Sequence, residues 1–128
     1  MKPEQLIYQR LKSFLQSNLP KGRYLLLRIE TSTAPGVPDI YFCYQNGSMW
    51  LETKTLNYKI SNEQIAWAHI HALAGGITKI VTLLDNSLVI LDFNDDMAHY
   101  STLQAYLRAK QPPLTPVQAY FSNSNLQP

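Results

Sequence analysis

The chain contains 128 residues, of which 45% are apolar and 16% are charged, a balance that excludes a disordered chain. Its length suits one domain with one hydrophobic core. The net charge of +2 is compatible with a nucleic-acid partner but does not indicate one. The single cysteine, Cys43, excludes an internal disulfide, and no apolar run approaches the ~20 residues of a membrane-spanning helix. We therefore expect a cytoplasmic protein.

The N-terminal part of the chain predicts a helix, a strand and a long loop. Pro3 suits the first turn of a helix over 3–17, and the proline and glycine within 18–22 end it. Alternating apolar residues predict a strand over 23–32, and further prolines predict an irregular loop over 31–38. The core-facing stripe of the helix is expected to contain Ile7, Leu11, Phe14 and Leu15.

The next stretch predicts a β-hairpin that turns at Asn46-Gly47, the preferred dipeptide of a two-residue type I′ turn. In the register of that turn, Asp39 faces Lys54 and Tyr41 faces Glu52. Because side chains alternate between the faces of a strand, both acids and the lysine share one face. Four apolar side chains take the opposite face and can join the core: Ile40, Phe42, Met49 and Leu51.

A second helix follows within 61–76, because Ser61 and Gln64 form a capping box and Gly75-Gly76 supplies the C-terminal stop. Two strands and a helix complete the pattern, at 77–84, 88–93 and within 95–110. This order predicts an α/β or α+β domain with a central mixed sheet flanked by helices. We assign residues 1–110 to the domain and 111–128 to a proline-containing C-terminal tail, either flexible or in contact with a partner or second copy.

The residues on the polar face of the hairpin suit a divalent-metal site. Hydrolysis of a phosphodiester needs an activated water and relief of negative charge, which carboxylate-held Mg²⁺ supplies. Mg²⁺ usually takes one or two protein carboxylates, here Asp39 and Glu52, and the backbone carbonyl of Thr53 is a candidate third ligand. Lys54 is placed to orient the water or offset phosphate charge, and Gln64 to hold a water or a phosphate.

Each of these residues also has an ordinary structural explanation. Asp39 could cap its loop, and Glu52 with Lys54 could form a solvated strand face. The chain has few charges, however, and two of them lie beside Trp50 on a strand near the middle of the sheet, which favours the metal site. Two more acids, Glu4 and Glu30, are alternative members of the site. Glu4 also has an ordinary explanation, because an acid is favourable at the positive N-terminus of a helix.

Four segments in this order resemble the PD-(D/E)XK nuclease superfamily: 36-GVPDIYF-42, 50-WLETK-54, 61-SNEQIAW-67 and 75-GG-76. Within the superfamily they are most similar to the VRR-NUC and phage or archaeal Holliday-junction-resolvase-like branch. The resemblance runs from Glu4 to Leu84. It implies a restriction-endonuclease-like fold, in which a mixed sheet has helices on both sides.

The resemblance also implies roles for individual residues. Asp39 and Glu52 match the metal-binding acids, Lys54 the catalytic lysine, Gln64 the glutamine after the E-x-K strand, and Glu4 the acid of the N-terminal helix. It implies Mg²⁺ as cofactor, with Mn²⁺ as a substitute, and DNA as partner. Members of this branch often act as homodimers on branched DNA, and the small size suggests a phage or mobile-element protein.

We therefore predict a Mg²⁺-dependent endodeoxyribonuclease that is structure-specific for branched DNA or junctions. Two alternatives stay open: a catalytically silent nuclease-fold module that binds DNA or protein, and a nuclease subunit that cuts only with a partner. Contacts with DNA are expected from the basic N-terminal region, at Lys2, Arg10, Lys12 and Arg28.

Overall fold

The computed structural model describes residues 1–30, 35–45 and 47–122. Helices and strands alternate along the chain and agree in order with the predicted pattern through the fifth strand. The elements are α1 (Pro3–Asn18), β1 (Tyr24–Arg28), β2 (Ile40–Tyr44), β3 (Gly47–Thr53), α2 (Asn62–Leu73), β4 (Thr78–Leu84), β5 (Ser87–Asp92), the 3₁₀ helix η1 (Asp95–His99), α3 (Leu103–Lys110), β6 (Thr115–Pro116) and α4 (Val117–Ser122).

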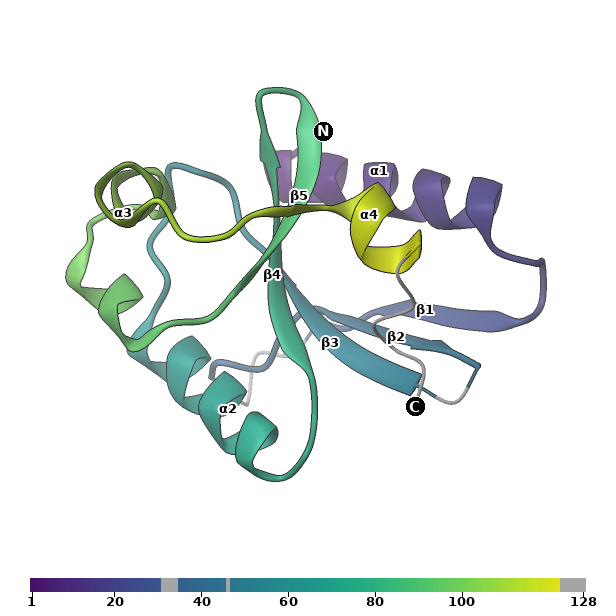
Figure 1. The fold of residues 1–128 in the computed structure, drawn as a ribbon, viewed down its shortest axis with the longest axis horizontal. Helices are drawn as coiled ribbons and strands as arrows, with labels where there is room; N and C mark the ends of the chain where they lie inside the picture. Colours follow the sequence, from purple (N-terminus) through teal and green to yellow (C-terminus); the bar gives the residue numbers. More distant parts are fainter. Residues whose placement is uncertain (31–34, 46, 123–128) are drawn as a thin grey trace.

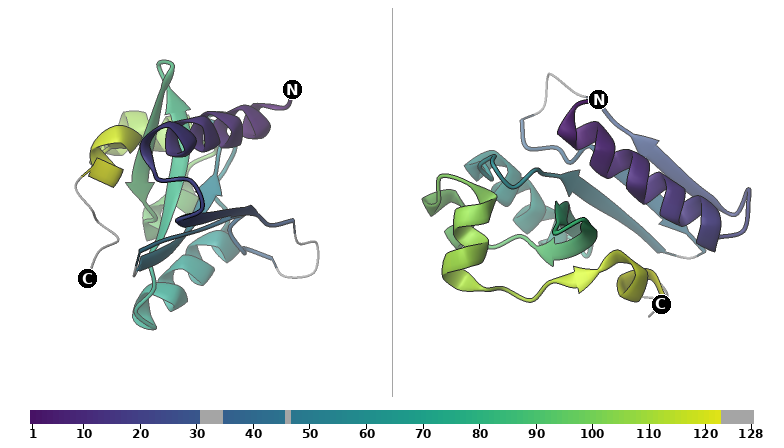
Figure 2. Two further views of the ribbon diagram at one scale, coloured as in Figure 1. Left: turned by 90° about the vertical axis from the view of Figure 1, so that its right-hand side faces the viewer. Right: turned by 90° about the horizontal axis from the view of Figure 1, so that it is seen from above.

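The strands form one six-stranded sheet in the order β1-β2-β3-β4-β5-β6. Neighbouring strands are antiparallel except β3 and β4, which run parallel and are joined by α2. In Figure 1, α1 and α4 lie on one side of the sheet and α2 lies on the other; the side view in Figure 2 shows the same separation for α1 and α2. The predicted mixed sheet with flanking helices is therefore confirmed.

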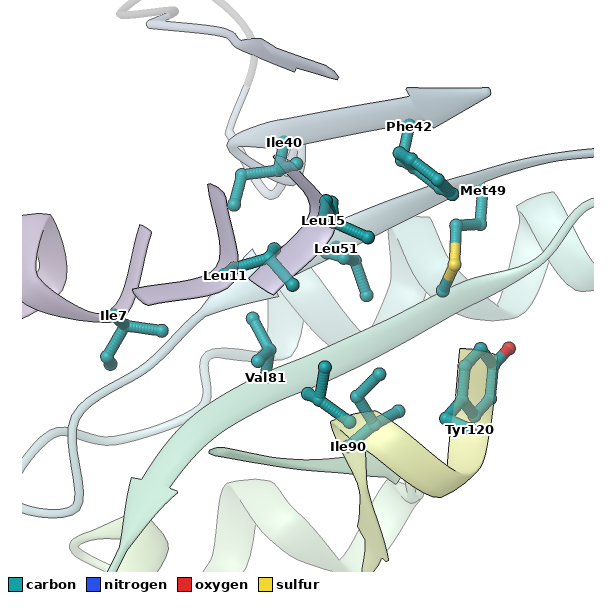
Figure 3. Close-up of a cluster of buried hydrophobic side chains, with 11 residues drawn as sticks. Ile7, Leu11, Leu15, Ile40, Phe42, Met49, Leu51, Val81, Ile90 and Tyr120 are labelled. Carbon is teal, nitrogen blue, oxygen red and sulfur yellow. The ribbon is translucent and has the colours of Figure 1, made fainter. Parts of the chain in front are cut away.

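A large hydrophobic core lies between the sheet and the two helices α1 and α4 (Figure 3). The apolar stripe of α1 is buried as expected, with the exception that Phe14 is only partly buried at its edge. Strands β2 to β5 contribute their inward-facing side chains. The buried members are Ile7, Leu11, Leu15, Ile40, Phe42, Met49, Leu51, Val81, Ile90, Val117 and Tyr120.

A second, smaller core lies on the opposite face of the sheet, under α2, η1 and α3. Its buried members are Ile60, Ile65, Ile80, Leu91, Met97, Leu103 and Tyr106. β4 and β5 are thus covered on both faces, which explains why Ile80 and Val81, adjacent in sequence, are both fully buried. Among the described residues, no helix is both long and apolar enough to cross a bilayer.

The edge strand β1 turns its more apolar face away from the core. Leu25 and Leu27 are 49% and 41% exposed, whereas Tyr24 and Leu26 pack against the large core. The aromatic ring of Tyr24 lies 6.2 Å from that of Phe42, measured between centroids. The alternation of leucines alone favours Leu25 and Leu27 on the core side of β1. The structure instead places Tyr24 and Leu26 there, where Tyr24 contacts Phe42.

The hairpin register differs from the predicted one by two residues. Tyr44 pairs with Gly47 and Tyr41 with Trp50, so Gly47 belongs to β3 and not to the turn; Asn46 lies outside the described residues. A shift of two keeps every side chain on its predicted face, and the four apolar residues are all fully buried. The observed register brings together the Tyr41 and Trp50 rings, with centroids 5.2 Å apart, a pair that sequence alternation alone does not detect.

The segment after residue 110, for which the sequence left open a flexible tail or a contact with a partner or second copy, forms β6 and α4 within the described residues. Thr115 and Pro116 pair with Ile90 and Val89 of β5, and α4 then folds back onto the large core. Tyr120 is 8% exposed, and its neighbour Phe121 lies against Phe42 with ring centroids 5.4 Å apart. A short strand and two aromatic side chains, too few to give a periodic pattern, hold this segment in place.

Candidate active site

Asp39 lies at a bend just before β2, where its backbone and side chain are both held. The N–H of Ile29 donates to the Asp39 carbonyl at 2.6 Å, which fixes this bend to the end of β1. The Asp39 carboxylate accepts a hydrogen bond from the Thr53 N–H, with N to Oδ1 at 2.9 Å, and a second from the Thr53 hydroxyl to Oδ2. Thr53 therefore fixes the orientation of the Asp39 carboxylate at the end of β3.

Glu52 is 8% exposed and has one oxygen satisfied and one free of protein partners. The Gln64 amide Nε2 donates to Glu52 Oε2 at 2.9 Å. The amide is itself oriented, because its Oε1 accepts from the Ser61 N–H at 2.9 Å in the predicted capping box. Glu52 Oε1, by contrast, is buried without any hydrogen-bond partner among the described residues.

Burial makes both carboxyl groups harder to ionise. Burial, followed by the charge of Asp39, raises the pKa of Glu52 to about 8 from its ordinary value of 4.5, and the charge of Lys54 opposes this rise. Burial also raises the pKa of Asp39, against the lowering effects of its hydrogen bonds from Thr53 and the charge of Arg28. Because the charge of Asp39 raises the pKa of Glu52, a positive charge placed between the two carboxyl groups would stabilise the ionised form of both.

Lys54 follows directly after β3, and its backbone N–H donates to the Val81 carbonyl of β4 at 3.1 Å. This bond continues the parallel pairing of β3 with β4 to the edge where Asp39 and Glu52 meet. Lys54 is two residues beyond Glu52, and its positive charge lowers the pKa of that carboxyl group. Gln64 is joined to Glu52 by a hydrogen bond, and the charges of Asp39 and Lys54 both act on Glu52, so the four residues that the sequence assigned to one site are neighbours here.

The pair of acids fits a hard divalent cation, on two observations. Asp39 and Glu52 offer oxygen ligands, the kind that Mg²⁺ prefers, and Glu52 Oε1 is buried with no protein donor to satisfy it. No group of three or more His, Cys, Asp or Glu side chains within 1–30, 35–45 and 47–122 is arranged to hold a metal ion, so Glu4 and Glu30 complete no such cluster here. Their participation, and that of the Thr53 carbonyl, stays a prediction.

The four predicted DNA-binding residues lie along α1 and β1 and differ in what they contact. Arg10 is engaged within the protein, since its guanidinium donates to Asn86 Oδ1 at 2.7 Å in the β4–β5 turn. The Arg28 guanidinium lies 5.6 Å from the centroid of the Tyr8 ring. Lys2 caps α1 through its backbone, and Lys12 lines a cavity of about 530 Å³ between α1 and β1. Arg10 therefore has a structural role, and contact with DNA stays a prediction for all four residues.

The loop that carries Asp39 is pressed against the start of α2. Gly36 has a φ of +85°, and a Cβ added there would lie 2.3 Å from the carbonyl oxygen of Glu63. The loop and α2 can approach this closely only because residue 36 has no side chain. This contact fixes the loop that ends at Asp39 against the first turn of α2, which carries Gln64.

We expect Gly36→Ala to lower the free energy of unfolding by about 2–5 kcal/mol, because it adds left-handed strain to a steric clash with backbone. Gly22→Ala is the matched control: Gly22 has a φ of +77° but no atom within 4 Å of the added Cβ. It should cost only about 1–2 kcal/mol from backbone strain. Urea unfolding followed by tryptophan fluorescence measures both, and equal losses would show that the Gly36 contact adds nothing.

Two residues with a role at the site were not predicted in that role: the Thr53 side chain and Gly36. Thr53 is 4% exposed and follows Met49 and Leu51 on the core-facing side of β3. A polar residue at a core-facing position of a strand is a signal for a specific hydrogen bond, which here goes to Asp39. Gly36 gave no comparable signal, because its neighbour Glu63 is distant in sequence.

Comparison with known proteins adds a weak structural likeness. No protein-family model and no curated protein matches the chain. Among solved structures, it is similar to Hjc, a Holliday junction resolvase from the archaeal hyperthermophile Archaeoglobus fulgidus, with 15% sequence identity and a TM-score of 0.46. The likeness covers 66% of this chain and 75% of that one. The function must therefore be argued from the chain's own residues.

Proposed function

We propose that this protein is a Mg²⁺-dependent endodeoxyribonuclease that acts on branched DNA. The observation that carries the proposal is the pair formed by the half-buried Asp39 and the buried Glu52. One Glu52 oxygen lacks a protein partner among the described residues, and the charge of Lys54 acts on the same carboxyl group. Two neighbouring carboxyl groups with pKa values raised by burial, one half-buried and one buried, are costly to the fold, and such costs concentrate at functional sites. The resemblance of the four sequence segments to the PD-(D/E)XK nucleases supports the same chemistry.

In this proposal each side chain has a separate task. Asp39 and Glu52 hold the cation, while Thr53 and Gln64 hold the two carboxylates through the hydrogen bonds described above. When bound, the cation neutralises phosphate charge and activates water for attack. The Lys54 ammonium stabilises negative charge that develops on the phosphate oxygens and orients the attacking water.

Cleavage of three labelled substrates tests the proposal: a four-way junction, a flap and a linear duplex, each with Mg²⁺, Mn²⁺ or EDTA. We expect metal-dependent cutting of a branched substrate and none in EDTA. Cutting of the linear duplex at the same rate as the branched substrates would contradict the proposed specificity for branched DNA. No cutting of any substrate, with DNA binding intact in EDTA, would instead indicate a silent nuclease-fold binding module.

We expect Lys54→Met to reduce cleavage by about 10²–10⁴-fold, the range for loss of a group that transfers or stabilises charge in the transition state. Methionine keeps the aliphatic length of the side chain, so the fold and metal binding should persist. Lys110→Met is the matched control, because Lys110 is exposed and pairs with Asp96, at 3.2 Å on the surface. A Lys54→Met protein that cuts at the wild-type rate would exclude Lys54 from the reaction.

A further inference from the structure

Two buried side-chain atoms lack a hydrogen-bond partner within the described part of the chain: Glu52 Oε1 and Thr82 Oγ1. The first belongs to the candidate active site. The second belongs to a side chain that is 0% exposed, in the middle of β4. Buried polar atoms almost always have partners, so each of these two atoms needs an explanation, and their place on neighbouring strands allows a single one.

Strand pairing places these two side chains on the same face of the sheet. Glu52 pairs with Ile80 in the parallel ladder between β3 and β4, and alternation puts Thr82 on the same face as Ile80. The same ladder, continued by one residue, sets Thr82 beside Lys54. From the usual spacings within a sheet, the Cα atoms of Glu52 and Thr82 are about 8 Å apart, near enough for their side chains to reach one shared ligand.

The threonine is not explained by packing. β4 is otherwise apolar at its centre, where Ile80 and Val81 are fully buried, and residue 82 pairs with Val89 on β5. Valine has the same branched outline as threonine but carries a methyl group where threonine carries the hydroxyl, so it would avoid the cost of burying a hydroxyl without a partner. The hydroxyl therefore costs stability in the free protein, which is the pattern expected of a group that awaits a ligand.

We propose that Thr82 is a positioning residue of the cation site, an inference that rests on the proposed function. Its hydroxyl binds a water molecule of the hydration shell of the cation that Asp39 and Glu52 hold. Mg²⁺ keeps several waters when it binds to proteins, and a buried water needs two to four polar partners, which the Thr82 hydroxyl, Glu52 Oε1 and Lys54 can supply. Thr82 thus satisfies its hydroxyl only when the cation is bound.

The test compares Thr82→Val with Thr82→Ser in two measurements: the Tm of the protein in EDTA, and the Kd for Mn²⁺ from a titration followed by electron paramagnetic resonance. We expect Thr82→Val to leave the Tm unchanged or raise it by about 2–4 °C, because an unsatisfied hydroxyl is removed. We expect the same change to raise the Kd for Mn²⁺ by about tenfold or more, as for other groups that support metal ligands. Thr82→Ser, which keeps the hydroxyl, should bind Mn²⁺ nearly as tightly as the wild type.

Thr78→Val provides the control on the same strand, because the Thr78 hydroxyl already has a partner, His71 Nδ1 at 2.6 Å. It should lower the Tm and leave the Kd for Mn²⁺ unchanged. A Thr82→Val protein with the wild-type Kd would overturn the role of Thr82 while leaving the proposed nuclease intact. Failure of the wild type to bind Mn²⁺ would overturn both, and a lower affinity that serine does not restore would indicate a role in packing alone.

Discussion

Glu52→Gln is expected to reduce Mg²⁺-dependent DNA cleavage by at least about 10³-fold. The amide keeps the size of the side chain and can still accept the hydrogen bond from Gln64 Nε2, so the local structure should persist. What is lost is the negative charge that binds the cation beside Asp39. A cation that stabilises the transition state by several kcal/mol accounts for a loss of this size, since each 1.36 kcal/mol is a factor of ten.

Glu63→Gln is the matched control for this prediction. Glu63 lies on the first turn of α2, next to Gln64, but its side chain is exposed, and the contact with Gly36 involves only its backbone. It should cut DNA at nearly the wild-type rate and bind Mg²⁺ normally. Equal activity of the Glu52→Gln and wild-type proteins would show that Glu52 has no part in cleavage.

The stability of the metal-free protein is expected to fall as the pH rises from about 5 to 8. The pKa of Glu52 is about 8 in the folded protein against 4.5 ordinarily, so within this range the folded state holds a proton that the unfolded state has released. Each pH unit then favours unfolding by about 1.4 kcal/mol, or roughly 4 kcal/mol over the whole range. Below pH 4.5 both states are protonated, and the full stabilising effect of the raised pKa is present.

Urea unfolding in EDTA at several pH values measures this slope, with Glu52→Gln as the control. Glutamine does not titrate and resembles the protonated acid, so the variant should lose much less stability between pH 5 and 8 and become more stable than the wild type at pH 8. Saturating Mg²⁺ should flatten the wild-type curve, because the cation binds the ionised carboxylates. Parallel curves for wild type and Glu52→Gln in EDTA would contradict the raised pKa of Glu52.

Local patterns were sufficient to predict the elements that carry the site. The alternation of side chains along β3 separates Leu51 from Glu52, and a register that shifts by two residues keeps Ile40 on the Leu51 face. The Ser61 and Gln64 capping box locates the start of α2. These rules depend on neighbours in sequence, so they hold before the chain folds. They brought Glu52 and Gln64 into the same prediction, and the structure joins them by a hydrogen bond.

Features that depend on distant parts of the chain were not predicted. The predicted hairpin register is wrong by two residues, because alternation does not distinguish registers that keep the same faces. The observed register pairs Tyr41 with Trp50, a contact between rings that alternation does not predict. The attachment of α4 depends on Tyr120 and Phe121 reaching the large core. The burial of the Thr82 hydroxyl without a partner among the described residues, and its place beside β3, depend on strand pairing that the sequence does not reveal.

The most direct test of a cation held by Asp39 and Glu52 is an anomalous diffraction map from crystals of the protein with Mn²⁺. We predict one strong peak in contact with carboxylate oxygens of both residues, including Glu52 Oε1, and its loss in crystals of Glu52→Gln. A map without a peak at these oxygens at saturating Mn²⁺, or with a peak that survives the substitution, would contradict the proposed metal site and the nuclease mechanism that depends on it.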